Sequence, residues 1–220
     1  MTRDRRIVAE ALGTALLLAV VIGSGIMGER LAGGNAAIAL LANAIATGCG
    51  LVTLILMFGT ISGAHFNPVV TLSEAWQKNL PVSDVLPYIA AQVVGAFAGV
   101  VAAHLMFGEP VFFASTHSRT GGAQWWSEFV ATFGLLATII SCSRSRPAAT
   151  PFAVAVYITA AYWFTASTSF ANPAVTLARA ASNTFAGIRP EDVCGFVAAQ
   201  LLGATAATGF FGWLYPAARD

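Results

Sequence analysis

The sequence is poor in charged residues. Asp, Glu, Lys and Arg make up only 10% of its 220 residues, whereas a soluble domain carries about 25%. So few charges cannot cover a water-exposed surface, and 57% of the residues are hydrophobic. The apolar residues form runs long enough to cross about 30 Å of hydrocarbon at about 1.5 Å per residue. The composition therefore predicts a polytopic membrane protein that lies in the lipid bilayer.

The patterns that would indicate chemistry are also scarce. The three cysteines lie far apart without a Cys-x-x-Cys pair, so we expect no disulfide and no metal site. The histidines do not pair with cysteines or carboxylates at ligand spacing, and no glycine-rich phosphate loop is present. The net charge is +1, and no basic run is long enough to bind nucleic acid. We therefore expect a protein that is not an enzyme, has no cofactor and binds no nucleic acid.

Six apolar segments are long enough to span a membrane, and two others are too short. The long segments are 7–27, 37–59, 85–107, 124–142, 150–167 and 193–215, and the short ones are 67–76 and 172–181. A signal peptide is the alternative for the first segment, but its apolar run is too long and further spans follow. Because hydrocarbon cannot satisfy free backbone groups, the short segments are expected to be re-entrant half-helices inside the protein.

The two halves of the chain repeat each other. Asn-Pro-Val-Val-Thr-Leu at 67–72 recurs as Asn-Pro-Ala-Val-Thr-Leu at 172–177, and Ala-Gln-Val-Val-Gly-Ala at 91–96 recurs as Ala-Gln-Leu-Leu-Gly-Ala at 199–204. Glu10 opens the first span and Glu128 the fourth. Three spans per repeat is an odd number, so the halves are inverted in the membrane and the functional site is expected at the midplane. We predict one transmembrane domain, 1–220, with halves of about 1–110 and 111–220.

The two Asn-Pro pairs have a physical role in such an arrangement. Proline is favoured at the first helical position, so Pro68 and Pro173 each start a short helix with Asn67 and Asn172 as N-caps. Each helix N-terminus carries roughly +0.5 of a charge. Two such ends at the midplane oppose cations, while the asparagine amides donate hydrogen bonds to neutral molecules. The alternative is that both asparagines only cap helices.

These motifs resemble a known family. Asn-Pro-Val and Asn-Pro-Ala at the heads of the short segments are similar to the paired Asn-Pro-Ala signature of the major intrinsic protein (aquaporin) family. Ile-Ser-Gly-Ala-His-Phe-Asn-Pro at 61–68 resembles the family's first half-helix loop, and the order of elements fits along the whole chain. The resemblance implies an all-α membrane fold with six transmembrane helices and two half-helices in an inverted 3+3 repeat. It also implies a passive channel for small uncharged solutes such as water and glycerol-like polyols, assembled as a homotetramer.

The same resemblance assigns site residues. The central constriction is expected from Asn67, Pro68, Val69, Asn172, Pro173 and Ala174, and a ladder of carbonyls from Gly63, Ala64, His65 and Phe66 and from Thr168, Ser169, Phe170 and Ala171. The His65 imidazole is expected to brace its loop. Glu10 and Glu128 are expected to accept hydrogen bonds from the backbone of the two loops. The alternative for Glu10 is a glutamate at the membrane edge.

The selectivity filter departs from the family pattern. Counting from the two asparagines as the family does gives Thr47, Ala160, Ser169 and Val175, with valine where most members have arginine. This set predicts a wider and more neutral filter than that of water channels. It resembles the bacterial branch associated with arsenical resistance, which implies uncharged arsenous acid or methylated arsenicals as permeants. Arg179 lies one helical turn further on, and the sequence does not decide whether it reaches the pore.

Positive charges predict the orientation. Arg3, Arg5, Arg6, Lys78, Arg144, Arg146 and Arg219 lie on the side of both termini, and Arg30, Arg119, Arg179 and Arg189 on the other. The excess predicts cytoplasmic termini in an inner (plasma) membrane.

Two other functions stay open. A secondary transporter is disfavoured because 85–107 and 150–190 contain no Asp or Glu for ion coupling. A poorly conducting structural family member would be expected to have long interaction tails.

Overall fold

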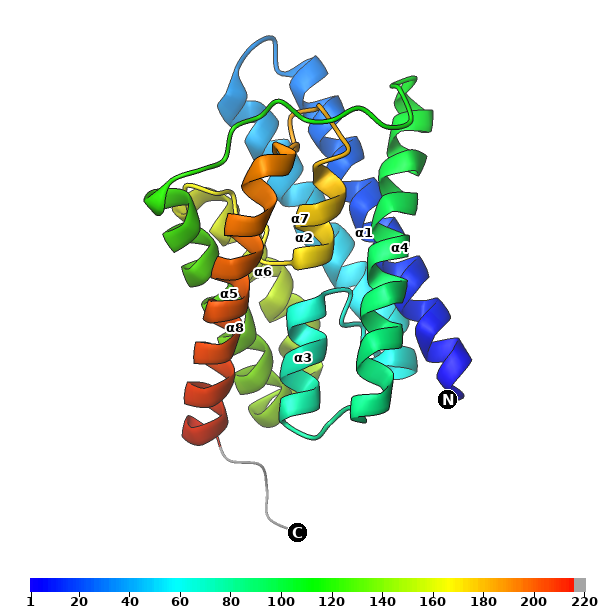
Figure 1. The fold of residues 1–220 in the computed structure, drawn as a ribbon, viewed down its shortest axis with the longest axis vertical. Coiled ribbons are helices and arrows are strands. Elements are labelled where there is room, and N and C mark those ends of the chain that lie inside the picture. Colours follow the sequence, from blue (N-terminus) through cyan, green and yellow to red (C-terminus); the bar gives the residue numbers. More distant parts are fainter. Residues whose placement is uncertain (216–220) are drawn as a thin grey trace.

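The computed structural model describes residues 1–215, which are almost entirely helical (Figure 1). The helices are α1 (Arg3–Leu31), α2 (Ala36–Ser62), α3 (Pro68–Trp76), α4 (Val82–Phe107), α5 (Gly122–Ser145), α6 (Thr150–Phe164), α7 (Pro173–Arg179) and α8 (Val193–Leu214), with 3-10 turns at Pro147–Ala149 and Pro190–Asp192. The predicted all-α fold and the order of six long and two short helices are confirmed. Arg219 lies outside the described residues.

The long helices match the predicted spans closely, except for α6. Within residues 1–215, five helical segments are long and apolar enough to cross a membrane, namely α1, α2, α4, α5 and Pro190–Leu214. Helix α6 has 15 residues and rises only about 22 Å. It ends at Phe164, three residues before the predicted end, because Thr165 adopts an extended backbone with φ −111° and ψ 139°. A turn at 165–168 and the loop after it then lead to α7.

The two half-helices occupy the middle of the molecule. In Figure 1, α3 and α7 run in opposite directions from the centre, with α1 and α4 on one side and α5 and α8 on the other. The first residues of α1 and the last turn of α8 lie at the same end. This is the arrangement expected of an inverted repeat with three long helices and one short helix in each half.

Glycines allow the long helices to cross closely. A Cβ at Gly95 would collide with the carbonyl oxygen of Ala11, and a Cβ at Gly203 would collide with that of Phe129. The first contact joins α4 to α1 and the second joins α8 to α5, at equivalent places in the two halves. Small residues at such crossings are typical of helix packing in lipid, where close backbone contact replaces the hydrophobic effect.

The outer surface of the bundle is apolar. Leu86, Val94 and Leu202 are 75%, 68% and 65% exposed, and they lie on long helices. Buried polar residues lie instead in the interior, where Glu10, Gln92, Glu128 and Gln200 are all 0% exposed. An apolar exterior around a polar interior is the reverse of a soluble protein, and it suits a bundle that is surrounded by hydrocarbon.

Candidate functional site

Both half-helices begin at an Asn-Pro pair, as their sequences require. The Asn67 side-chain oxygen accepts a hydrogen bond from the Val69 N–H at 3.1 Å. The Asn172 oxygen accepts from the N–H groups of Ala174 and Val175 at 3.0 and 3.3 Å. Proline follows each asparagine at the first helical position, where its missing N–H leaves no hydrogen bond unmade. The capping interactions therefore hold the oxygen of each amide and leave its nitrogen free to point elsewhere.

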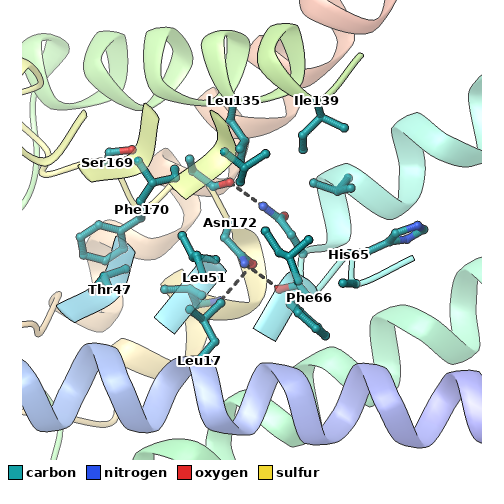
Figure 2. Close-up of a pocket in the computed structure, with 18 of the residues that line it drawn as sticks. Leu17, Thr47, Leu51, His65, Phe66, Leu135, Ile139, Ser169, Phe170 and Asn172 are labelled. Atoms are coloured by element: carbon teal, nitrogen blue, oxygen red, sulfur yellow. Dashed lines mark hydrogen bonds between the residues drawn. The ribbon is translucent and has the colours of Figure 1, made fainter. Parts of the chain in front are cut away.

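The amide nitrogens link the two halves of the repeat. Asn67 Nδ2 donates to the Ala171 carbonyl and Asn172 Nδ2 donates to the Phe66 carbonyl, each at 2.8 Å (Figure 2). An amide NH₂ group has two N–H donors, and each of these bonds uses one. Both asparagines line the cavity described below, so each retains one donor for a molecule inside it.

The loops before the asparagines have an unusual backbone. Left-handed φ angles occur at Gly63 (91°), Ala64 (52°) and Phe66 (49°), and at the equivalent positions Thr168 (61°), Ser169 (52°) and Ala171 (48°). A residue other than glycine in this region costs on the order of 1–3 kcal/mol and persists only where its surroundings hold it. The repeated pattern indicates that both loops keep a specific backbone shape against an energetic preference.

Glu10 supplies the hydrogen bonds that hold the first loop. One of its carboxylate oxygens accepts from the Ser62 hydroxyl at 2.6 Å and from the His65 N–H at 3.0 Å. The other oxygen accepts from the Phe66 N–H at 2.7 Å and from the Gln92 side chain at 2.8 Å. Glu10 is fully buried in α1, and its carboxylate contacts the loop and Gln92 instead of solvent.

Glu128 holds the second loop in the same way. Its carboxylate accepts from the N–H groups of Phe170 and Ala171, each at 2.9 Å, and from the Gln200 side chain at 2.6 Å. Gln200 also donates to the Thr176 hydroxyl at 2.8 Å, which ties α8 to α7. Each carboxylate accepts several hydrogen bonds at once, so each glutamate fixes a strained loop to two long helices.

Both asparagines line one cavity of about 250 Å³. Figure 2 shows Thr47, Ser169 and Phe170 at one end, His65 at the other and Asn172 between them. Of the predicted residues, those that line it are Thr47, Gly63, Ala64, His65, Phe66, Asn67, Ser169, Phe170, Ala171, Asn172 and Val175. Pro68, Val69, Pro173, Ala174 and Thr168 are not among its lining residues, and they lie beside it in the half-helices and the second loop.

Ala160 does not reach the cavity, so its assignment to the filter is corrected. It is exposed on the outer surface of α6, whereas Val154, Ile158 and Tyr162 line the cavity. Lining residues four apart lie on one helix face, and a residue two positions away points to the opposite face. The Tyr162 hydroxyl lies 3.2 Å from the Thr47 hydroxyl, so tyrosine occupies the place expected for alanine.

Arg179 does reach the cavity. It lines the same end as Thr47 and is only 2% exposed. Its Nε donates to the Ala186 carbonyl, and its guanidinium carbon lies 3.3 Å from the centroid of the Phe170 ring. Sequence reasoning left this position open because helix periodicity gives a direction but not the length of the path to the cavity.

Arg119, in the loop after α4, lies behind the same ring, and sequence reasoning gave it no role. Its guanidinium carbon is 5.0 Å from the Phe170 ring centroid. Its Nε donates to the Gly187 carbonyl at 2.8 Å, and one terminal nitrogen donates to the Ser167 carbonyl at 3.2 Å. Burial lowers the pKa of the Arg119 guanidinium from its ordinary value, and the negative charge of Glu128 opposes this shift. No sequence motif indicates this contact.

The opposite end of the cavity has a different character. Glu74 lines it together with His65. His65 Nδ1 lies 3.1 Å from the Thr71 hydroxyl of α3, and the centroid of its ring lies 5.3 Å from that of Tyr88 in α4. His65 also lines the cavity, so it contacts both neighbouring helices and the cavity. Within residues 1–215, no group of three His, Cys, Asp or Glu side chains is placed to hold a metal ion.

The chain is similar to proteins named aquaporins and aquaglyceroporins over most of its length. The family model described as "Major intrinsic protein" matches residues 1–161. Aquaglyceroporin AqpS of Rhizobium meliloti (strain 1021) is 57% identical over 215 residues, which cover 98% of this chain and 92% of that protein. Aquaporin NIP2-3 of Zea mays is 34% identical over 84% of this chain, which spans only 62% of its length. The aquaglyceroporin structure from Plasmodium falciparum superimposes with a TM-score of 0.72 over 96% of both chains, and its 19% identity supports the fold alone.

Proposed function

Because the chain belongs to the major intrinsic protein family, a family of membrane channels rather than enzymes, we propose that it conducts small uncharged solutes and excludes ions at Asn67 and Asn172. The protein is a multi-pass membrane protein whose family passes small neutral molecules. Water and glycerol-like polyols are the proposed permeants. The name of the 57% identical relative, an aquaglyceroporin, supports the inclusion of polyols.

The observation that carries the proposal is the cavity that passes two opposed helix N-termini. Asn67 and Asn172 each keep one N–H donor beside it, and a neutral hydroxyl oxygen accepts such a bond without leaving a charge behind. A cation loses its hydration shell in the same place and meets two positive dipole ends instead. The geometry thus favours neutral solutes that contain oxygen over cations.

The lining at the Thr47 end supports solutes larger than water. Val175 occupies the position at which most family members have arginine, and it removes a long charged side chain from that position. Thr47, Ser169 and Tyr162 supply hydroxyl groups around the remaining space. Uncharged arsenous acid and methylated arsenicals belong to the same proposed class of permeants, since they are small molecules with hydroxyl groups.

A secondary transporter is less well supported than a channel. Among the described residues the acidic side chain that lines the cavity is Glu74, which lies at one end and not beside the asparagines. Glu10 and Glu128 are nearer the middle, but their oxygens are occupied by backbone and glutamine donors. Ion coupling needs a midplane group that binds and releases a cation, and no such group faces this cavity within residues 1–215.

The assembly and orientation are carried over as parts of the same proposal. We expect a homotetramer with one pore per subunit, and one channel domain over 1–220 with halves of about 1–110 and 111–220. Arg179 is buried, so it does not count as a loop charge. Six described Lys and Arg residues then lie at the end that holds the first turn of α1, against three at the other. This excess supports cytoplasmic termini in an inner (plasma) membrane.

Stopped-flow light scattering on proteoliposomes tests the proposal. We expect the protein to speed both osmotic shrinkage in sucrose and re-swelling in glycerol above the rates of empty liposomes, with arsenite behaving like glycerol. Glu109→Gln, which changes a half-buried residue far from the asparagines, serves as the folding control. Rates equal to those of empty liposomes for water, glycerol, urea and arsenite alike would refute the channel and favour the structural family member. Flux that requires a proton or sodium gradient would instead identify a transporter.

A further inference from the structure

Arg179 presents unused hydrogen-bond donors to the cavity. Its side chain is 2% exposed and lines the cavity at the Thr47 end. The Nε donates to the Ala186 carbonyl, and within residues 1–215 the two terminal nitrogens have no hydrogen-bond partner. A buried guanidinium ordinarily has all its donors satisfied, because a buried charge without partners is costly. The free N–H groups therefore lie where a molecule in the cavity can satisfy them.

A second arginine lies close to the first. The guanidinium carbons of Arg179 and Arg119 are 3.3 and 5.0 Å from the same Phe170 ring centroid, so they lie at most 8.3 Å apart. That distance is about one Debye length at physiological salt, and a buried pair is screened less than an exposed one. Among the described residues neither side chain forms a salt bridge with a carboxylate. The positive charges therefore repel each other without a bonded counter-ion.

A buried hydroxyl next to this pair also lacks a partner. Ser169 is 3% exposed and lines the cavity, and its hydroxyl oxygen makes no hydrogen bond within residues 1–215. Figure 2 shows Ser169 at the same end as Phe170 and Thr47. The free hydroxyl and the free guanidinium are independent observations, and both indicate an acceptor that is supplied by a bound molecule.

We propose that Arg179 and Ser169 form a binding subsite for one small monovalent carboxylate, with Phe170 as its wall and Arg119 as a positioning residue. The planar guanidinium presents two parallel N–H donors that match the two oxygens of a carboxylate. Glu128, which accepts from the Phe170 N–H, offsets one of the two positive charges, so a single negative charge balances the rest. Occupation of the subsite obstructs the cavity and slows the flux of neutral solutes.

Binding is measured directly, without any need for conduction. The full chain in detergent micelles is titrated with trifluoroacetate, a monovalent carboxylate, and the ¹⁹F NMR signal of the ligand is followed. We expect saturable broadening for the wild type and an affinity about tenfold or more weaker for Arg179→Gln, since hydrogen bonds to charged groups are lost. Arg30→Gln changes an exposed arginine paired with Glu109, and it should leave the affinity unchanged.

A second variant keeps the test decisive if Arg179→Gln does not fold. Ser169→Ala removes a hydroxyl that has no partner in the protein, so the fold should persist while trifluoroacetate binds about fivefold more weakly. Equal affinity in wild type and in both variants would overturn the subsite. Displacement of trifluoroacetate by chloride at equal concentration would overturn the carboxylate assignment, because chloride lacks the two oxygens that match the two parallel N–H donors.

Flux measurements separate this inference from the proposed function. Acetate added to proteoliposomes should slow wild-type glycerol entry and leave Ser169→Ala much less affected. If the protein conducts no glycerol but still binds trifluoroacetate through Arg179, the channel proposal fails and the subsite stands. If glycerol passes at a rate that acetate does not change, and NMR shows no saturable binding, the channel stands and the subsite is refuted.

Discussion

Replacing Glu10 by glutamine tests how the first loop is held in its strained shape. The carboxylate accepts four hydrogen bonds, from Ser62, His65, Phe66 and Gln92. The glutamine oxygen can replace only one carboxylate oxygen. With the NH₂ group in the other place, the Ser62 hydroxyl can turn to accept from it, but the His65 N–H loses its acceptor. One bond to a charged acceptor is then lost, so Glu10→Gln should destabilise the fold by about 1.5–3 kcal/mol.

Thermal unfolding in detergent, followed by fluorescence-detected size exclusion, measures this effect. A loss of about 2 kcal/mol corresponds to a decrease of about 4–8 °C in the midpoint for a chain of this size. Glu109→Gln, which removes an exposed ion pair to Arg30, should lower the midpoint by a few degrees at most. The surviving Glu10→Gln protein should also conduct glycerol more slowly, because the Phe66 carbonyl that receives the Asn172 amide belongs to the weakened loop.

Comparison with the second half of the repeat makes the test more specific. Glu128 accepts three hydrogen bonds, and one of its oxygens accepts only from the Phe170 N–H. In Glu128→Gln the amide NH₂ can face that single donor, so one bond is lost here as well and the expected decrease is similar. If Glu10→Gln unfolds at the wild-type midpoint, or if only one of the two variants is destabilised, the reasoning from hydrogen-bond partners is refuted.

Three further substitutions test the site and the packing. Asn172→Asp replaces the amide donor to the Phe66 carbonyl by a negative oxygen, so glycerol flux should fall and cation leakage should rise. Light scattering measures the glycerol flux and a sodium-sensitive dye measures the cation leakage. Unchanged values of both would contradict the role of the amide. Val175→Arg should slow glycerol more than water in stopped-flow assays and change proton leakage little; equal slowing would argue against a wide filter. Gly203→Val should lower the thermal midpoint by colliding with the Phe129 carbonyl, whereas Gly212→Ala, which has open space, should not.

The repeat made much of the fold predictable from the sequence. The two Asn-Pro pairs fix where α3 and α7 begin, and the structure places both starts at the predicted residues. Gly95 and Gly203 belong to the repeated Ala-Gln-x-x-Gly-Ala segments, and a Cβ at either position would collide with a carbonyl of the neighbouring helix. These features depend on local chemistry, namely a cap, a proline or a missing side chain, and local chemistry can be read from a short stretch of sequence.

The filter was less predictable because it depends on how each helix is rotated. Counting back from Asn172 assumes that the chain between α6 and α7 has the family's geometry. In the structure α6 ends at Phe164 and turns Ile158 and Tyr162 toward the cavity, which leaves Ala160 on the outside. A rotation of this size is determined by contacts such as the packing of Gly48 against Thr159, and the sequence does not specify it.

Arg179 changes the explanation for ion exclusion. In the family pattern one arginine both narrows the filter and charges it, and valine at position 175 can do neither. Arg179, one helical turn further along α7 and stacked on Phe170, supplies a positive charge at the same end of the cavity. Width and charge are then set by different residues, since Val175 leaves room and Arg179 supplies the field. We expect a filter of this kind to admit bulkier neutral solutes and to keep its barrier to cations. Val175→Arg would narrow the Thr47 end of the cavity, where Arg179 already supplies a positive charge. We therefore expect this variant to alter the size of the solutes that pass far more than it alters proton leakage.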